Sequence, residues 1–291
     1  TQVVSPDLIA RDPSAPDDPW TLTVSGSADI LAIGRRRRVS IGRMSGHEAL
    51  PPLLATVGNM VEPVFSSSGR WLLTRSNQDS RIHVWQASTW TEFMSLPGHT
   101  GGPSVMAISP DERSILSVDN AGVMRLWAGP GAGWRREYPD SAVAPHDFAM
   151  NPKSNTIWAA CTDGTIAEWS PQSDSQPRVF RADPKCAYTV DYSPSLDLLA
   201  SAGEAGYVVL TRERKRVPPE LVVLPGFPVV DLRFSPDGRF LAACSKYSPL
   251  VVYDTRSWMP VRSIGLKIGR LATVRWSPDG TSIAVSGSDG G

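Results

Sequence analysis

Residues 229–244, VVDLRFSPDGRFLAAC, hold two apolar runs on either side of a four-residue turn signal. In this signal, Ser235-Pro236-Asp237-Gly238, the serine hydroxyl can bond the following backbone, the proline fixes its own φ, and the glycine tolerates left-handed geometry. The run before the turn alternates apolar and polar residues, and the run after it is mostly apolar. Both patterns are typical of β-strands. The stretch therefore predicts a β-hairpin.

Two more runs of strand length follow this hairpin. They are LVVYD at 250–254 and PVRSIGL at 260–266, and polar residues separate them. The 26 Pro and 24 Gly of the chain interrupt such runs throughout, and we find no long stretch with helical periodicity. We therefore expect a repeating unit of four short antiparallel strands.

The same turn recurs along the chain. The units align on Ser25, Ser66, Ser109, Asn151, Ser193, Ser235 and Ser277, which are 41 to 43 residues apart. Seven units of four antiparallel strands predict an all-β fold, a seven-bladed β-propeller. We expect a single domain over 1–291. Its blades would cover about 20–58, 59–99, 100–141, 142–184, 185–226 and 227–268, and a last blade at 269–291 would be completed by 1–12.

The last unit contains only two predicted strands, LATVRW and TSIAVSG. An uncovered strand edge there would favour aggregation, so another segment should pair with it. When the sequence is read from Gly291 back into Thr1, Val3 and Val4 fall where the other third strands end, and Leu8 to Ala10 fall where a fourth strand belongs. We expect N-terminal strands to close the ring. A truncated chain whose tail supplies one strand is the alternative, and the missing initiator Met also indicates a processed or excised segment.

The ends of the third predicted strands carry a second signature. Three of them end in tryptophan, at Trp85, Trp127 and Trp169, one ends in Tyr253-Asp254, and a Gly98-His99 pair stands where a unit begins. With these residues the chain resembles the WD-repeat (WD40-type) β-propeller family. The resemblance implies that a His, a Ser or Thr, an Asp and the Trp form a hydrogen-bonded tetrad in each blade. The structural repeat positions it implies are Asp79, Trp85, His99, Ser117, Trp127, Asp163, Trp169, Tyr253 and Asp254.

The signature is degenerate. Two units have the aspartate six residues before their tryptophan, at Asp79 and Asp163, but lack the histidine. The unit of His99 contains Ser117, but Ala121 occupies the aspartate position. We expect no complete tetrad and a fold that depends mainly on packed apolar strands. The turns and the degenerate repeats are similar to those of bacterial members, whose propellers are often sensor domains of larger signalling proteins. This implies other domains of a parent protein as partners.

The composition excludes several classes of protein. Lys+Arg and Asp+Glu are 29 each in 291 residues, which indicates neither a disordered chain nor a polycation. No apolar run is long enough for a membrane helix and no export signal is visible, so we expect a cytoplasmic protein without a membrane partner. Cys161, Cys186 and Cys244 are far apart and form no CxxC pair. We expect three small buried residues, with neither disulfides nor a zinc site.

The strongest charge feature is a basic cluster made of Arg35, Arg36, Arg37, Arg38 and Arg43. Adjacent guanidinium groups bind carboxylates or phosphates through paired hydrogen bonds. The cluster would occupy the loop between the second and third strands of the first blade. Three interpretations stay open: a site for an acidic or extended protein segment, a nucleic-acid contact, and a solvated loop. A second basic run at 212–216 would lie on the opposite face, which argues against a continuous nucleic-acid track.

The chain lacks the motifs of familiar active sites. Its four histidines are isolated, and neither a GxxxxGK nor a GxSxG motif occurs before a helix. We expect no catalysis, no metal and no cofactor, and we expect His99 to bond structurally beside Trp127. Three further tryptophans, Trp90, Trp134 and Trp258, follow the third strands and would cap the outer hairpins. The sequence favours a non-catalytic scaffold or sensor domain that binds a protein on one propeller face. The alternative is a propeller enzyme or small-ligand binder in the central channel.

Overall fold

The computed structural model describes residues 21–26, 30–34, 38–43, 49–54, 60–76, 80–119, 122–129, 134–138, 145–170, 177–212, 215–216, 222–223, 227–245, 249–265 and 271–287. Every regular element in these ranges is a β-strand. The prediction of an all-β protein is confirmed. In this part of the chain, no helix has the length and apolar character needed to cross a membrane.

The described residues form seven antiparallel sheets. The first three contain β1 (Thr21–Val24), β2 (Ile30–Gly34), β3 (Arg38–Arg43) and β4 (Ala49–Leu54); β5 (Met60–Phe65), β6 (Trp71–Ser76), β7 (Ile82–Gln86) and β8 (Thr91–Leu96); and β9 (Pro103–Ile108), β10 (Ser114–Asp119), β11 (Met124–Ala128) and β12 (Trp134–Tyr138).

The remaining sheets follow in the same order along the chain. They contain β13 (Pro145–Met150), β14 (Ile157–Cys161), β15 (Thr165–Trp169) and β16 (Arg178–Arg181); β17 (Ala187–Ser193), β18 (Leu198–Gly203), β19 (Tyr207–Arg212), β20 (Lys215–Arg216) and β21 (Val222–Val223); β22 (Val229–Phe234), β23 (Phe240–Ser245), β24 (Leu250–Asp254) and β25 (Pro260–Ile264); and β26 (Leu271–Trp276) and β27 (Ile283–Gly287).

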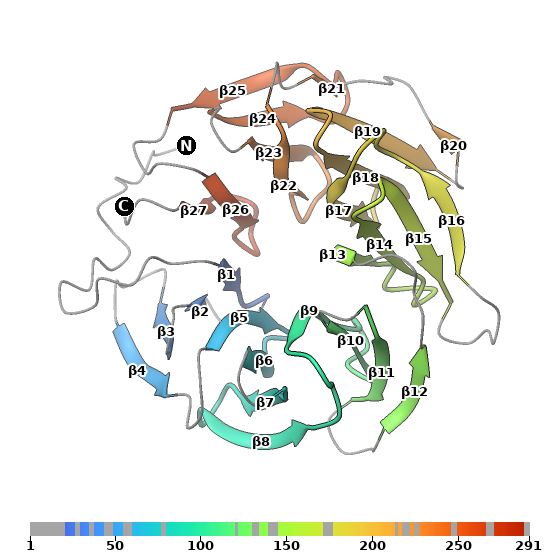
Figure 1. The fold of residues 1–291 in the computed structure, drawn as a ribbon. Helices are drawn as coiled ribbons and strands as arrows, with labels where there is room; N and C mark the ends of the chain where they lie inside the picture. Colours follow the sequence, from blue (N-terminus) through green and yellow to red (C-terminus); the bar gives the residue numbers. More distant parts are fainter. Residues whose placement is uncertain are drawn as a thin grey trace.

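The sheets are arranged around a common centre (Figure 1). The first strand of each sheet lies nearest the centre, and β4, β8, β12, β16 and β25 lie at the rim. We call the first strands β1, β5, β9, β13, β17, β22 and β26 the inner strands. Each inner strand contacts the inner strand of the next sheet, and β26 contacts β1. This arrangement is consistent with a β-propeller.

The hairpin turn forms as its sequence predicts. The amide of Gly238 donates to the carbonyl of Ser235 at 2.8 Å, and the amide of Phe240 donates to the Ser235 hydroxyl at 2.9 Å. Gly238 has a φ of 73°, a left-handed geometry that costs glycine little. A Cβ there would lie 2.1 Å from the hydroxyl oxygen of Ser195 in the preceding sheet. The turn therefore requires glycine both for its backbone geometry and for its close contact with the neighbouring sheet.

Apolar side chains from facing sheets form the core. One cluster joins Leu210 of β19 to Leu232 of β22, and another joins Leu73 of β6 to Trp127 of β11. The seventh sheet packs on the first through Ala284, which joins a cluster with Leu22 and two further residues of β2. Because every cluster of this kind needs two sheets, no sheet buries its apolar face alone.

The tryptophans that follow the third strands occupy tight turns. Trp90 and Trp258 both have a φ of 55°, and each donates its amide to the carbonyl four residues earlier. Their partly buried rings pack on clusters between sheets, as expected of apolar caps. Trp134 instead lies at the start of β12, and its side chain is outside the described residues.

The fifth sheet departs from the expected pattern of four strands. Its outer strand is divided into β20 and β21, which both pair with β19. Pro218 and Pro219 stand between these two segments in the sequence. Proline has no backbone N–H to donate to a ladder, so this sequence does not favour one continuous outer strand.

Candidate functional site

The basic cluster predicted from the sequence lies mostly outside the described residues. This holds for Arg35 to Arg37 and for the side chain of Arg38, which opens β3. Arg43 is the last residue of β3 and is exposed. A role for these arginines in partner binding therefore stays a prediction.

The third sheet contains a complete tetrad. His99 Nδ1 lies 3.1 Å from Asp119 Oδ2, and its Nε2 lies 2.6 Å from the Ser117 hydroxyl oxygen. The indole N–H of Trp127 donates to the same hydroxyl at 2.8 Å. Because a carboxylate only accepts, Nδ1 carries the proton and Nε2 accepts from Ser117. All four groups are buried, and His99 lies beside Trp127 as a structural role would require.

The expectation that no unit has a complete tetrad is wrong. The aspartate is Asp119, eight residues before Trp127 rather than six. It opens the turn 119–122, in which the amide of Gly122 donates to the Asp119 carbonyl at 2.9 Å. The position expected from the other units is Ala121, which lies outside the described residues. The Asp119 carboxylate, two residues before Ala121, still reaches His99 because Asp119 is the last residue of β10.

The other repeat positions carry only fragments of this network. The indole of Trp85 donates to the Thr74 hydroxyl at 2.8 Å, whereas the buried indole N–H of Trp169 has no hydrogen-bond partner among the described residues. Asp163 is exposed and accepts from Thr165. The remaining positions behave as follows: Tyr253 is buried, Asp254 accepts from the amides of Arg256 and Ser257, and Asp79 is outside the described residues.

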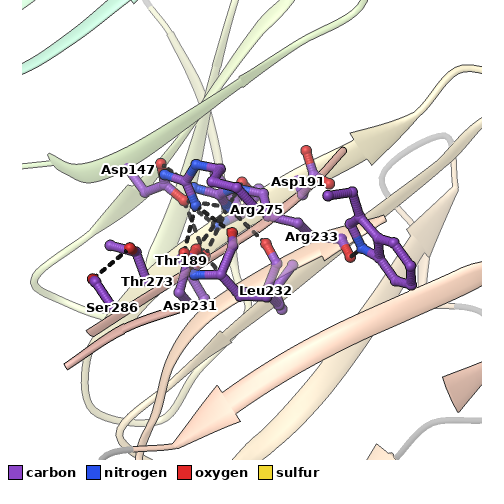
Figure 2. A network of polar contacts seen from close by, with 12 residues as sticks. Asp147, Thr189, Asp191, Asp231, Leu232, Arg233, Thr273, Arg275 and Ser286 are labelled. Atoms are coloured by element: carbon purple, nitrogen blue, oxygen red, sulfur yellow. Dashed lines mark hydrogen bonds and ion pairs between the residues drawn. The ribbon is translucent and has the colours of Figure 1, made fainter. Parts of the chain in front are cut away.

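A second polar network joins the inner strands of four consecutive sheets (Figure 2). Its members stand at equal positions in successive units. Asp147, Thr189, Asp231 and Thr273 are 42 residues apart, as are Asp191, Arg233 and Arg275. We call these seven residues the inner network.

Irregular pairing precedes four of these positions. The register of the inner strand shifts between Pro145 and Asp147, and again between Val229 and Asp231. The same shift occurs before Thr189 and Thr273. Such β-bulges leave one residue unpaired and re-aim the next side chain. The side chains of Asp147, Thr189 and Asp231 reach the neighbouring inner strand, whereas the Thr273 hydroxyl bonds Ser286 of its own sheet.

The side chains of the inner network satisfy backbone groups of the next sheet. An inner strand is an edge strand, so one row of its N–H groups has no partner within its own sheet. Asp147 accepts from the amide of Val190 at 3.1 Å, and Asp231 accepts from the amide of Val274 at 2.8 Å. Thr189 accepts from the amide of Leu232 at 3.3 Å. The fourth, fifth and sixth sheets thus each bind the next sheet through a side chain.

Two arginines neutralise the carboxylates of this network. Arg233 lies 2.9 Å from Asp147 and 3.0 Å from Asp231, and Arg275 lies 2.5 Å from Asp231. Burial alone would lower the pKa of Arg233, but the two carboxylates outweigh it and raise that pKa. Because Arg233 also donates to the carbonyls of Val190 and Leu232, it ties three consecutive sheets together.

Asp191 is the carboxyl group least matched by cations. It accepts from the amide of Phe234 at 2.7 Å. Desolvation raises the pKa of Asp191 to about 6, although Arg233 and the Phe234 amide partly oppose the rise. Below about pH 6 the folded protein therefore holds this group mainly in its neutral form, in contrast to a surface aspartate with a pKa of about 3.9.

We expect Asp191→Asn to stabilise the protein above pH 6. The Asp191 carboxyl contributes most to the free energy of unfolding below about pH 4. This contribution is lost as the pH rises through about 6, because the pKa of the group is higher in the folded state than in the unfolded state. The amide is neutral at every pH and keeps an acceptor for Phe234. Urea unfolding should give a gain of about 2 kcal/mol at pH 8 that shrinks toward pH 4. A gain that does not change with pH would contradict this assignment.

The remaining chemistry of the described residues is limited. No group of three or more His, Cys, Asp or Glu among them is placed to hold a metal ion. The three cysteines are free, and Cys161 and Cys244 are buried as expected. Cys186 is only partly buried, so the prediction of three buried cysteines is wrong at that position.

Comparisons with known proteins match two segments of the chain to one repeat family. Residues 90–128 and 220–248 match the WD domain, G-beta repeat (WD40). The first segment contains all four members of the tetrad. The chain is 27% identical over 195 residues to the meiotic recombination protein rec14 of Schizosaccharomyces pombe, covering 64% of this chain and 63% of that protein.

Two further relatives are longer proteins. The chain is 26% identical over 221 residues to transcription initiation factor TFIID subunit 5 of Caenorhabditis elegans, covering 73% of this chain and 33% of that protein. It is 22% identical over 256 residues to the periodic tryptophan protein 2 homolog of Dictyostelium discoideum, covering 85% of this chain and 27% of that protein. These relatives are eukaryotic, so the comparisons do not support the expected resemblance to bacterial members.

Proposed function

We propose that this WD-repeat protein is a non-catalytic interaction scaffold, which binds a protein partner on one face of its ring of sheets. The observation that carries the proposal is the inner network. Its charged groups accept from and donate to neighbouring strands, so their hydrogen-bonding capacity is used to hold sheets together. A rigid frame reduces the entropy that loops lose when they bind, and loops on such frames often carry recognition.

The names of the relatives agree with this role. One relative is named as a subunit of a transcription initiation factor and therefore belongs to an assembly. The chain spans 63% of the yeast relative and a third or less of the two longer ones. From these relatives we therefore transfer to this chain only a general role, that of a repeat protein that takes part in assemblies. Other domains of a larger parent protein remain candidates for the partner, together with separate proteins.

We further propose that the basic cluster binds an acidic or extended segment of the partner. It supplies guanidinium groups for carboxylates, and in the sequence it begins directly after β2. We do not propose nucleic acid or a membrane as a partner. The three free thiols agree with a reducing compartment such as the cytoplasm.

A charge-reversal experiment tests this function. The purified chain and a variant with Arg35 to Arg38 changed to Glu are used to capture partners from lysate of the source cell, and each retained protein is then purified and titrated against both. We expect one protein that binds the original directly and binds the variant at least about tenfold more weakly. The matched control reverses four exposed residues elsewhere, Lys153, Arg178, Arg256 and Arg262. Equal binding by both variants would refute the role of the cluster, and no direct partner would refute the scaffold.

A propeller enzyme or a small-ligand binder at the centre is the second candidate. One observation favours it, because Asp147, Asp191 and Asp231 come together there and the pKa of Asp191 is raised to about 6. A raised carboxyl pKa is typical of general acids as well as of structural groups. If Asp191→Asn keeps the captured partner, the carboxyl group has no part in recognition.

We also propose that the ring has seven blades with the boundaries expected from the repeats, and that residues 1–12 complete the last blade. Two observations support closure. Ala284 of β27 packs with Leu22 and Leu31 of the first sheet. In addition, β27 pairs only with β26 among the described residues, so its other edge is available to a further strand.

A further inference from the structure

A pocket of about 170 Å³ lies between the fourth and fifth sheets. It opens beside the turns that join the first and second strands, because Asn151 and Asp197 of those turns line it. Clefts for drug-sized ligands occupy roughly 300–1,000 Å³. The size of this pocket therefore fits a single side chain better than a cofactor or a metabolite.

Aromatic rings form one wall of the pocket. Trp158 and Tyr192 stack with their ring centroids 4.9 Å apart, and Phe180 lines the pocket beside them. All three side chains are only partly buried. The faces of aromatic rings attract cations through their quadrupole.

Two carboxylates stand beside these rings in fixed positions. Glu168 accepts from the indole N–H of Trp158 at 3.1 Å, and Asp197 accepts from the Tyr192 hydroxyl at 2.5 Å. Arg212 also lines the pocket, but its guanidinium donates to the backbone carbonyls of Leu196 and Asp197. The charged lining residues therefore leave one net negative charge.

One lining residue of the pocket has a hydroxyl group that finds no partner in the described part of the chain. Thr211 is 4% exposed, and its Oγ1 has no hydrogen-bond partner among the described residues. A buried hydroxyl without a partner is costly, and most such groups in native proteins are satisfied. A donor bound in the pocket would satisfy it once the Thr211 side chain turns, because the oxygen is almost fully covered in the free protein.

We propose that this pocket receives an arginine side chain of a protein partner. The proposal rests on the proposed function, because it presumes a protein partner. A guanidinium is planar and carries five N–H donors, so it can stack on an aromatic face while it donates to carboxylates and to a hydroxyl. The rings of Trp158 and Phe180, the carboxylates of Glu168 and Asp197, and the Thr211 hydroxyl offer this combination.

A peptide titration tests the pocket with the purified chain and without the natural partner. The probes are the blocked peptide Gly-Gly-Arg-Gly-Gly and the same peptide with neutral, nearly isosteric citrulline. The readout is the indole N–H resonance of Trp158, identified by its loss in Trp158→Phe. We expect the arginine peptide to shift this resonance to saturation and the citrulline peptide to bind at least about tenfold more weakly. Equal binding of both peptides, or an unmoved resonance, would overturn the proposal.

Three variants separate recognition from folding. Glu168→Gln and Asp197→Asn keep an acceptor for Trp158 and Tyr192, and asparagine tolerates the φ of 50° at position 197. Each should weaken arginine-peptide binding at least about fivefold, since each removes a charge from the site. Thr211→Val should also weaken binding of the arginine peptide. The melting temperature of this variant should stay equal to or above that of the wild type, because the hydroxyl has no hydrogen-bond partner among the described residues. Glu92→Gln, on the exposed surface of another sheet, is the matched control and should bind as the wild type does.

The outcomes distinguish this proposal from the function on which it rests. If the peptide binds as expected but no protein partner is found, the scaffold fails and the arginine site stands. If a direct partner is found but neither peptide moves the Trp158 resonance, the scaffold stands and the arginine site is refuted.

Discussion

Replacement of Asp231 by alanine lowers the free energy of unfolding by about 3–5 kcal/mol, the expected cost of removing one partner from a buried ion pair. The Asp231 side chain is 5% exposed and faces both Arg233 and Arg275. Its loss leaves Arg275 without its carboxylate and the amide of Val274 without its acceptor. For a chain of this size, the loss corresponds to a fall in melting temperature of roughly 10 °C.

A matched control removes a carboxylate from an exposed pair. Glu92 lies 2.9 Å from His83 and is exposed, so Glu92→Ala should change the stability by less than about 1 kcal/mol. Asp231→Asn keeps two polar groups in place, so its loss of stability should lie between the losses expected for Asp231→Ala and Glu92→Ala. Urea unfolding measured for all three variants tests the order. A loss at Asp231 as small as the loss at Glu92 would show that the inner network does not hold the sheets together.

Deletion of residues 1–12 is expected to lower the stability by roughly 5 kcal/mol or more. In the proposed closure, Val3, Val4, Leu8 and Ile9 belong to the outer strands of the last blade. Complete burial of each such side chain contributes about 1.5–3 kcal/mol, and partial burial contributes less. The deletion would also expose the free edge of β27, so we expect concentration-dependent aggregation.

Thermal unfolding and light scattering of the shortened chain measure both effects. A milder variant, with Val3 and Val4 changed to Ser, should show a smaller fall in melting temperature without loss of the tail. An unchanged midpoint in both variants would remove the closure proposal. A fall in the deletion variant alone would favour the alternative in which the tail contributes a single strand by its backbone.

The sequence was sufficient to predict the hairpins, because each of their determinants is local. The turn at Ser235 to Gly238 needs only hydrogen bonds between residues two to five apart and one left-handed glycine. The buried ends of the third strands were also predictable, since Trp85 and Trp127 recur at one position of the repeat. The period of the repeat therefore contained most of the information on the sheets.

The inner network was not predicted, because its contacts join residues 42 and 86 positions apart. Neither Asp147 nor Arg233 is unusual within its own unit. A signal did exist, since the same two positions of the last four units carry Asp, Thr or Arg, with Ala149 as the one apolar exception. A comparison of units position by position would have found it. Asp119 was not predicted for the opposite reason. It lies two residues before the position that the aspartate occupies in the other units.

The hydrogen bonds between inner strands also have a direction. In each described case the acceptor side chain belongs to the earlier sheet and the amide belongs to the later one, as with Thr23 and Phe65, Asp147 and Val190, and Asp231 and Val274. During synthesis, a ribosome would release each acceptor before the strand that requires it. Blades could therefore be added one at a time onto a template that already exists, in the order in which domains and repeats usually fold during translation. A chain rearranged to start just before β13 would form the contact between Asp147 and Val190 first, whereas the contact between Thr23 and Phe65 would form only after the seventh sheet.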